Sequence, residues 1–142
     1  MTTPYRVLVV DDDENFSQIV AETLTAAGYE VQTADDGLRG YLRYLDQQPE
    51  IVLTDIQMPE LDGLEMIRCI RSINPNVKAI YISGAISQYR EALTSEGKEY
   101  GALVLNKPFS RNDLLASMNG WLRDHDRELS PSQRSPVSHA RR

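Results

Sequence analysis

The stretch Ile51–Gly63, IVLTDIQMPELDG, decides the fold and points to the functional site. Four apolar or β-branched residues lead directly into the carboxylate of Asp55, and Pro59 and Gly63 mark a loop soon after it. A short apolar run bounded by turn residues predicts a strand that is buried on both faces of a sheet. Asp55 then falls at the carboxyl end of that strand, where open α/β sheets place their ligand sites.

Composition indicates one globular domain of 142 residues, with 41% hydrophobic and 25% charged residues, which is enough to bury a core without staples. The single cysteine excludes an internal disulfide, and no Cys/His cluster indicates a structural metal, so a reducing compartment is expected. The N-terminus lacks the apolar run of a signal peptide, and no stretch has membrane-spanning length. We therefore expect a cytoplasmic protein without membrane insertion.

The net charge of −6 is unevenly distributed along the chain. From Arg123 onward five arginines face three acidic residues, so the preceding body carries −8. An acidic body argues against direct nucleic-acid binding and favours a cation site or a basic partner.

Strand and helix patterns alternate along the chain. Strands are predicted at residues 5–10, 30–34, 51–55, 79–82 and 103–105, and helices at 14–27, 38–47, 64–73, 87–100 and 111–121. This alternation predicts an α/β fold, a doubly wound five-stranded parallel sheet with helices on both faces. Right-handed crossovers favour the strand order 2-1-3-4-5.

Domain boundaries and buried faces follow from the same patterns. We expect a domain at residues 1–123 and a disordered tail at 124–142, because the tail is rich in Ser, Pro and Arg and poor in large aliphatic residues. Cys69 is expected to be a small core residue. Helical spacing predicts that the first two helices turn these residues toward the core: Phe16, Ile19, Val20, Leu24, Leu38, Tyr41, Leu42 and Leu45.

Charged and polar residues stand at, or directly after, the carboxyl ends of four of the predicted strands. They are Asp11 and Asp12, Asp55, Ser83 and Lys107. Each has an ordinary explanation on its own: an acidic run caps a helix, and a lysine is usually a solvated surface residue. At one edge of a sheet, however, the carboxylates would repel each other unless a cation joined them. Mg²⁺ suits such a site, since it takes one or two carboxylates together with water and phosphate oxygens.

Four motifs carry a family resemblance: VLVVDDD, VLTDIQMPELDG, YISGA and LNKPF. With them the chain resembles the receiver domain of two-component response regulators, which has a flavodoxin-like fold. The resemblance covers residues 5–121. No output domain can be recognised after Trp121, so we expect a single-domain member.

This resemblance implies the role of each site residue. Asp55 is expected to be the phosphoacceptor, and Ser83 and Lys107 to contact the phosphoryl group. The expected Mg²⁺ ligands are Asp11, Asp12, Asp55 and the backbone carbonyl of Gln57. The Lys107-Pro108 bond is expected to be cis, as is usual in the family.

The family also implies a signalling role rather than an enzymatic one. The donor would be a phosphohistidine on a sensor histidine kinase or a histidine phosphotransfer protein, and the output would be binding to an unidentified downstream protein. A magnesium phosphohydrolase acting on small phosphate esters is an alternative, although such an enzyme is expected to have a second acidic residue at position 57, where this chain has Gln57. A further alternative is a nucleotide- or flavin-binding domain, but such a domain is expected to have a glycine-rich first loop, where this chain has DDDENF. A receiver that binds a partner without phosphorylation also stays open.

One position departs from the family pattern. Three residues before the lysine the family usually carries Tyr or Phe, which swings inward on phosphorylation, whereas this chain has Val104. Valine has no ring to rotate and little rotamer freedom. We therefore expect movement of the loop at residues 84–87 to carry the signal, alone or with a different partner such as Tyr100. Tyr81 is expected simply to fill the core.

Overall fold

The computed structural model describes residues 5–128, with side chains described as far as Trp121. Residues 129–142, most of the predicted disordered tail, lie outside the described residues. The chain divides into two compact units, one ending at Phe109 and one beginning at Ser110. The elements are, in order, β1 (Arg6–Val10), α1 (Glu14–Ala26), β2 (Glu30–Ala34), α2 (Gly37–Gln47), β3 (Ile51–Asp55), α3 (Gly63–Arg71), β4 (Lys78–Ser83), the 3-10 helix η1 (Ile86–Tyr89), α4 (Arg90–Tyr100), β5 (Leu103–Asn106) and α5 (Arg111–Glu128).

The five strands form one parallel sheet in the order β2-β1-β3-β4-β5, which confirms the predicted fold class and topology. The interior strands β1, β3 and β4 are buried along most of their length, and their sequences are accordingly rich in apolar residues. In this order β1, β3, β4 and β5 are consecutive neighbours, so their carboxyl ends share one edge.

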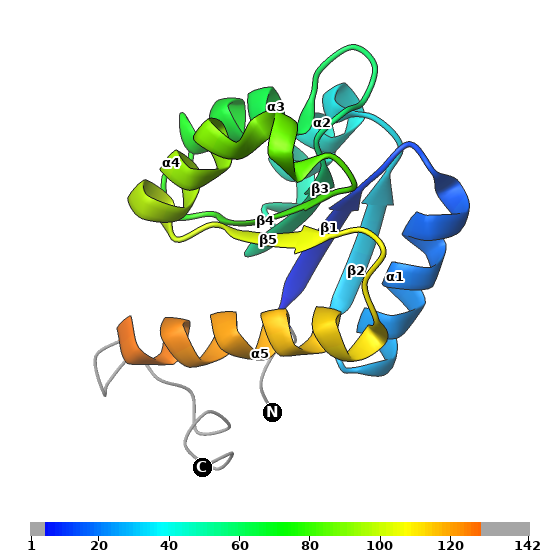
Figure 1. The fold of residues 1–142 in the computed structure, drawn as a ribbon. Coiled ribbons are helices and arrows are strands. Elements are labelled where there is room, and N and C mark those ends of the chain that lie inside the picture. The colour runs from blue at the N-terminus through cyan, green and yellow to red at the C-terminus, as the bar shows by residue number, and fades with distance from the viewer. Residues whose placement is uncertain (1–4, 129–142) are drawn as a thin grey trace. The chain divides into compact units, whose positions relative to one another are not determined.

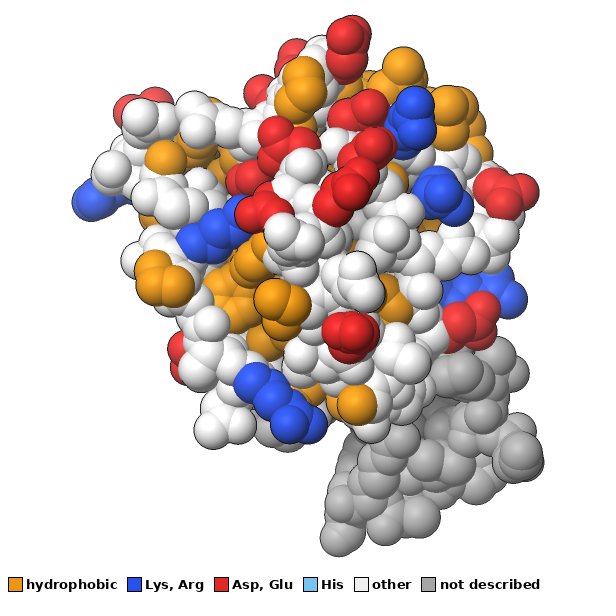
Figure 2. All heavy atoms as spheres, turned by 90° about the vertical axis from the view of Figure 1, so that its right-hand side faces the viewer, with side chains coloured by type: hydrophobic (Ala, Val, Ile, Leu, Met, Phe, Trp, Pro, Cys, Tyr) orange, Lys and Arg blue, Asp and Glu red, His pale blue; other side chains and the backbone are white. Residues whose placement is uncertain are grey.

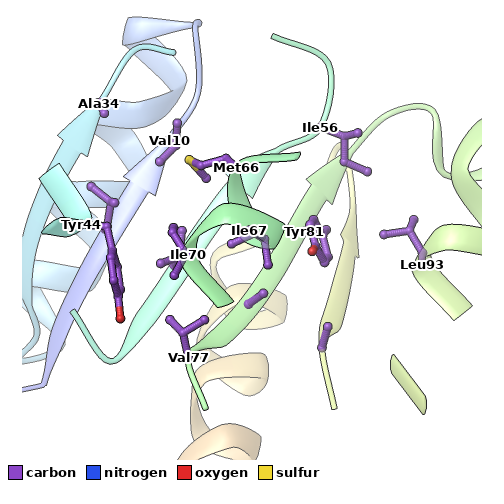
Figure 3. Packing of buried hydrophobic residues seen from close by; sticks show 14 residues of the cluster. Val10, Ala34, Tyr44, Ile56, Met66, Ile67, Ile70, Val77, Tyr81 and Leu93 are labelled. Carbon is purple, nitrogen blue, oxygen red and sulfur yellow. The ribbon is translucent and has the colours of Figure 1, made fainter. Parts of the chain in front are cut away.

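Helices of the first unit cover the two faces of the sheet (Figure 1). α1 packs against β1 and β2, whereas α2, α3 and α4 share the opposite face. On that face the side chains form a continuous buried cluster, which in the view of Figure 3 runs from Tyr44 through Ile70 and Ile67 to Tyr81 and Leu93. This cluster fixes α3 and α4 against the strands that carry the candidate site.

Helix starts follow the capping rules. Asp13 caps α1 by accepting from the Phe16 N–H, and Asp62 and Glu65 form a reciprocal capping box at the start of α3. α1 ends before Gly28, whose φ of 101° requires the left-handed region. α5 begins with the Ser110–Asp113 pair, each side chain accepting from the other residue's N–H.

Two helices differ from the prediction. The fourth helical segment is interrupted, because η1 precedes α4 rather than continuing it. α5 continues to Glu128 instead of ending at Trp121. The added residues, LRDHDRE, contain no Gly or Pro, so nothing in them ends the helix, and the predicted end was wrong.

The predicted buried face of α2 is wrong at its three leucines, although Tyr41 packs against the buried cluster as expected. Leu38, Leu42 and Leu45 are 50%, 54% and 42% exposed, whereas the buried positions include two glycines and Tyr44. The glycines explain the rotation: a Cβ on Gly40 would lie 2.6 Å from the Met66 sulfur, so α2 approaches its neighbours through its smallest residues. Ile19 and Cys69 are exposed too, contrary to expectation.

Among the described helices, none combines the length and apolarity needed to span a bilayer.

Candidate phosphoacceptor and cation site

The structure brings three carboxylates together at the carboxyl edge of the sheet. Asp11 and Asp12 directly follow β1, and Asp55 is the last residue of β3. One oxygen from each lies within 4.8 Å of the others. Asp11 is buried, Asp55 is partly buried and Asp12 is exposed, so the group opens to solvent on one side. Figure 2 shows acidic side chains gathered on the upper part of the molecule.

Asp11 is the most firmly held of the three. Its Oδ1 accepts from the Asp13 N–H at 2.9 Å, and its Oδ2 lies 2.9 Å from the Lys107 Nζ. The buried Ser17 hydroxyl donates to the Asp11 carbonyl at 3.2 Å. With no exposed side-chain surface, this carboxylate keeps one orientation toward the site.

Asp55 has less compensation for its charge. Its Oδ1 accepts from the Ile56 N–H at 2.7 Å, while its Oδ2 lies 3.5 Å from the Lys107 Nζ, farther than the corresponding Asp11 oxygen. Burial raises the pKa of Asp55, Lys107 partly opposes this, and Asp11 adds to the rise. Gly63 lets the next helix start against this residue, since a Cβ there would lie 2.1 Å from the Asp55 carbonyl oxygen.

Lys107 is the cation of the site. Burial alone would lower the pKa of its ammonium, but the carboxylates of Asp11 and Asp55 outweigh that effect and raise it. Lys107 therefore stays charged. The peptide bond to Pro108 is cis, as the resemblance implied.

Phe16 belongs to this site, which the sequence reasoning missed. The Lys107 Nζ lies 4.4 Å from the centre of the Phe16 ring, and Phe109 contacts that ring edge-on at a centroid distance of 5.7 Å. Helical spacing had assigned Phe16 to the core. The sequence feature that could have placed Phe16 at the site is its position in the first turn of the helix that follows the acidic run.

Ser83 and Gln57 flank the carboxylates in different ways. Ser83 ends β4 one residue beyond Ile82, the register partner of Asp55. It is buried, and its hydroxyl oxygen accepts from the Ala85 N–H at 2.9 Å. Gln57 is exposed in the loop after β3, and its side chain donates to Gln88 at 3.4 Å.

The donor set fits a small, hard divalent cation. Three carboxylates face one ammonium, so the cluster keeps an excess of negative charge. Its oxygens are those that Mg²⁺ prefers, and the exposed side leaves room for the waters that this ion retains. The residues able to hold it are Asp11, Asp12 and Asp55.

Comparison with known proteins agrees with this geometry. The sequence profile described as the response regulator receiver domain matches residues 7–119, which is most of the chain. The chain belongs to the response regulator receiver domain family. Receiver domains of this family serve signalling in two-component systems.

The relatives include a whole protein of similar length. The response regulator receiver protein CpdR from Brucella abortus is 34% identical over 117 residues, which cover 82% of this chain and 96% of CpdR. The chain spans about half the length of other curated relatives, such as transcriptional regulatory proteins of Bacillus subtilis and Mycobacterium tuberculosis.

Two solved structures illustrate the likeness. A CheY-like receiver domain protein from Methanospirillum hungatei has a TM-score of 0.80 and 26% identity, covering 89% of this chain and all of that one. The receiver domain of the sensor histidine kinase PA1611 from Pseudomonas aeruginosa has a TM-score of 0.73 and 26% identity, covering 84% of this chain and 98% of that one. That receiver domain is described with a magnesium ion coordinated in its active-site cleft.

Proposed function

We propose that this receiver domain takes a phosphoryl group from a phosphohistidine onto Asp55, and that it then signals by binding another protein. One observation carries the proposal: the partly buried Asp55 carboxylate lies 3.5 Å from the Lys107 ammonium and close to two further carboxylates at the edge of the sheet. A nucleophile, a fixed cation and a set of metal-binding oxygens are the parts that phosphoryl transfer needs.

The chain's own residues have separate roles in the transfer. A carboxylate oxygen of Asp55 forms a bond to phosphorus as the bond between phosphorus and the histidine nitrogen breaks, and that nitrogen keeps the electron pair. Lys107 neutralises charge on a phosphoryl oxygen, and the Ser83 hydroxyl donates to another. Phe16 limits the movement of Lys107. Water later hydrolyses the acyl phosphate, so the domain modifies itself rather than turning over a metabolite.

Asp11, Asp12, Asp55 and the backbone carbonyl of Gln57 would hold Mg²⁺. When bound, this ion would neutralise the carboxylates and the charge on the incoming phosphoryl group. The magnesium reported in the PA1611 receiver domain supports this part of the proposal.

We further propose that the protein acts in the cytoplasm, with a sensor histidine kinase or a histidine phosphotransfer protein as its donor. Family membership and the occurrence of a similar receiver domain within a sensor kinase support this donor class. The phosphohydrolase alternative is disfavoured because position 57 offers an amide that is bonded to Gln88 rather than a second acid.

Labelling with a small phosphoryl donor tests the proposal. Incubation with Mg²⁺ and acetyl phosphate should add one phosphoryl group per chain, and Asp55→Asn should abolish the addition, as measured by intact mass. Asp35→Asn is the matched control, because Asp35 directly follows β2 but lies outside the carboxylate cluster. Labelling that survives in Asp55→Asn, or that depends equally on Asp35, contradicts the assignment.

A further inference from the structure

A second charged cluster lies between α3, α4 and β4, under the helix surface. The Tyr81 hydroxyl donates to the Glu96 Oε1 at 2.6 Å, and the Arg71 Nη1 pairs with the same oxygen. The Arg71 guanidinium also lies over the Tyr100 ring, 3.8 Å from its centre. The Arg71 side chain is only 6% exposed and that of Glu96 only 18%, so this is a buried polar link between two helices and a strand.

Strand geometry connects this cluster to the phosphoacceptor site. Tyr81 and Ser83 are two residues apart on β4, so their side chains lie on the same face of the sheet. Tyr81 is also the register partner of Val104 on β5. The tyrosine ring therefore stands on the strand next to the position where the family usually carries its mobile aromatic residue. Tyr81 fills the core as expected, but its hydroxyl also ties β4 to α4.

The cluster leaves hydrogen-bonding capacity unused. Within the described part of the chain, the Nε and Nη2 of Arg71 are buried and have no hydrogen-bond partner. Meanwhile a single Glu96 oxygen serves both Tyr81 and Arg71. Buried unpaired donors are costly, and an arginine binds a carboxylate best through two parallel bonds. If Glu96 left Tyr81, a second arrangement that uses the free Arg71 nitrogens would become available.

Resting on the proposed phosphoacceptor role of Asp55, we infer that the Tyr81–Glu96 hydrogen bond holds α4 in its resting position. In the resting protein the Ser83 hydroxyl oxygen accepts from the Ala85 N–H, at the start of the segment leading to α4. When the site is loaded, the same hydroxyl contacts the phosphoryl group. The resulting displacement of α4 separates Glu96 from Tyr81 and lets it pair with the free side of Arg71. Tyr81 is thus a positioning residue that acts through Glu96 and replaces the aromatic residue missing at position 104.

The test compares wild type with Tyr81→Phe, which removes only the hydroxyl. Mg²⁺ with beryllofluoride serves as the phosphoryl mimic, and backbone hydrogen exchange is read for residues 84–100. In the unloaded Tyr81→Phe variant, exchange in α4 should be roughly tenfold faster, because a hydrogen bond to a charged group is lost. The change that the mimic induces in α4 should shrink accordingly. By reciprocity, the mimic should bind Tyr81→Phe at least about fivefold more tightly.

Tyr44→Phe is the matched control, because Tyr44 is equally buried but its hydroxyl accepts from Asn74, away from α4. It should leave both the affinity for the mimic and the exchange of α4 unchanged. Glu96→Gln keeps the shape of the side chain but weakens the Arg71 pair as well as the Tyr81 bond, so it should speed the exchange of α4 in the unloaded protein without reproducing the tighter binding of the mimic.

Several outcomes would overturn the inference. Unchanged or weaker binding of the mimic by Tyr81→Phe removes the proposed restraint, as does an equal effect of Tyr44→Phe. If wild type is labelled at Asp55 but α4 exchange does not respond to the mimic, the inference fails and the proposed function stands. If Asp55 is not labelled at all, the proposed function itself fails.

Discussion

Two charged clusters of the same domain differ in how their charge is balanced. At the sheet edge, Lys107 pairs with two of three clustered carboxylates, and the third, Asp12, is exposed to solvent. Between α3 and α4, one arginine faces one glutamate in a nearly closed space. The first cluster has more negative charge than its own residues neutralise, and the second is neutral as it stands.

The carboxylate cluster is thus suited to bind a cation, whereas the Arg71–Glu96 pair is suited to connect two helices. Excess like charge at an open edge is unfavourable until a cation arrives, so removing one carboxylate relieves repulsion. A buried neutral pair behaves in the opposite way, because removing one partner leaves the other charged and unpaired. The same kind of substitution should therefore have opposite effects on stability in the two clusters.

Glu96→Ala should give the largest effect, lowering the free energy of unfolding by about 3–5 kcal/mol, since it leaves the Arg71 charge buried without its partner. Chemical denaturation measures the change. Glu99→Ala, at an exposed position on the same helix, is the control and should change stability little. A loss below about 1 kcal/mol for Glu96→Ala would mean that Arg71 finds solvent or another partner easily, and the two clusters would not differ as described.

Mg²⁺ should stabilise the wild type by about 2.7 kcal/mol at a concentration one hundred times its dissociation constant. Asp12→Ala should lose most of that gain while being as stable as wild type, or more stable by less than about 1 kcal/mol, without the ion. Thermal melts with and without Mg²⁺ measure both effects. A variant that melts lower without metal yet keeps the full shift would contradict a shared cation site at Asp11, Asp12 and Asp55.

Asp55→Asn should raise the stability of the metal-free protein at neutral pH, by less than the magnesium shift. Burial raises the pKa of Asp55, so the folded state holds this proton more tightly than the unfolded state does. Wild-type stability therefore falls as pH rises above the usual carboxyl value of about 3.9, until the folded-state pKa is passed. The advantage of the Asn variant should accordingly shrink as pH is lowered toward 4. Denaturation at several pH values in the presence of a chelator checks this prediction. If the Asn variant were more stable by the same amount at every pH, its gain in stability would come from packing rather than from the charge of Asp55.

Much of the carboxylate cluster could be predicted from sequence because it depends on a topological rule. Once the strands are recognised, the parallel order brings their carboxyl ends to one edge whatever the details of packing. The same reasoning predicted the order of the strands in the sheet.

The second cluster could not be predicted because it depends on which helix faces meet. Charge alone places Arg71 and Glu96 at the surface, and only the packing of α3 beside α4 makes them partners. The predicted burial of the α2 leucines was wrong for a related reason. Helix α2 approaches its neighbours closely through Gly40, and this turns the leucines outward. Phe16 fits a core pattern by spacing, yet its ring lies under Lys107, a contact between residues far apart in sequence.

The smallest effect concerns Tyr81 at high pH, and it tests whether its hydroxyl is as enclosed as the second cluster requires. Burial and the bond to Glu96 raise the pKa of Tyr81 far above its usual value of about 10. In the unfolded chain the phenol ionises near pH 10, so the stability that this tyrosine contributes is fully present below that pH and declines above it. The stability of wild type relative to Tyr81→Phe should therefore fall as pH rises from 9 to 11. In the folded proteins, the alkaline rise in tyrosinate absorbance should be the same for both, because Tyr81 stays protonated. A smaller rise for the Phe variant over that range would mean that Tyr81 ionises within the fold, and that α4 does not hold its hydroxyl against Glu96.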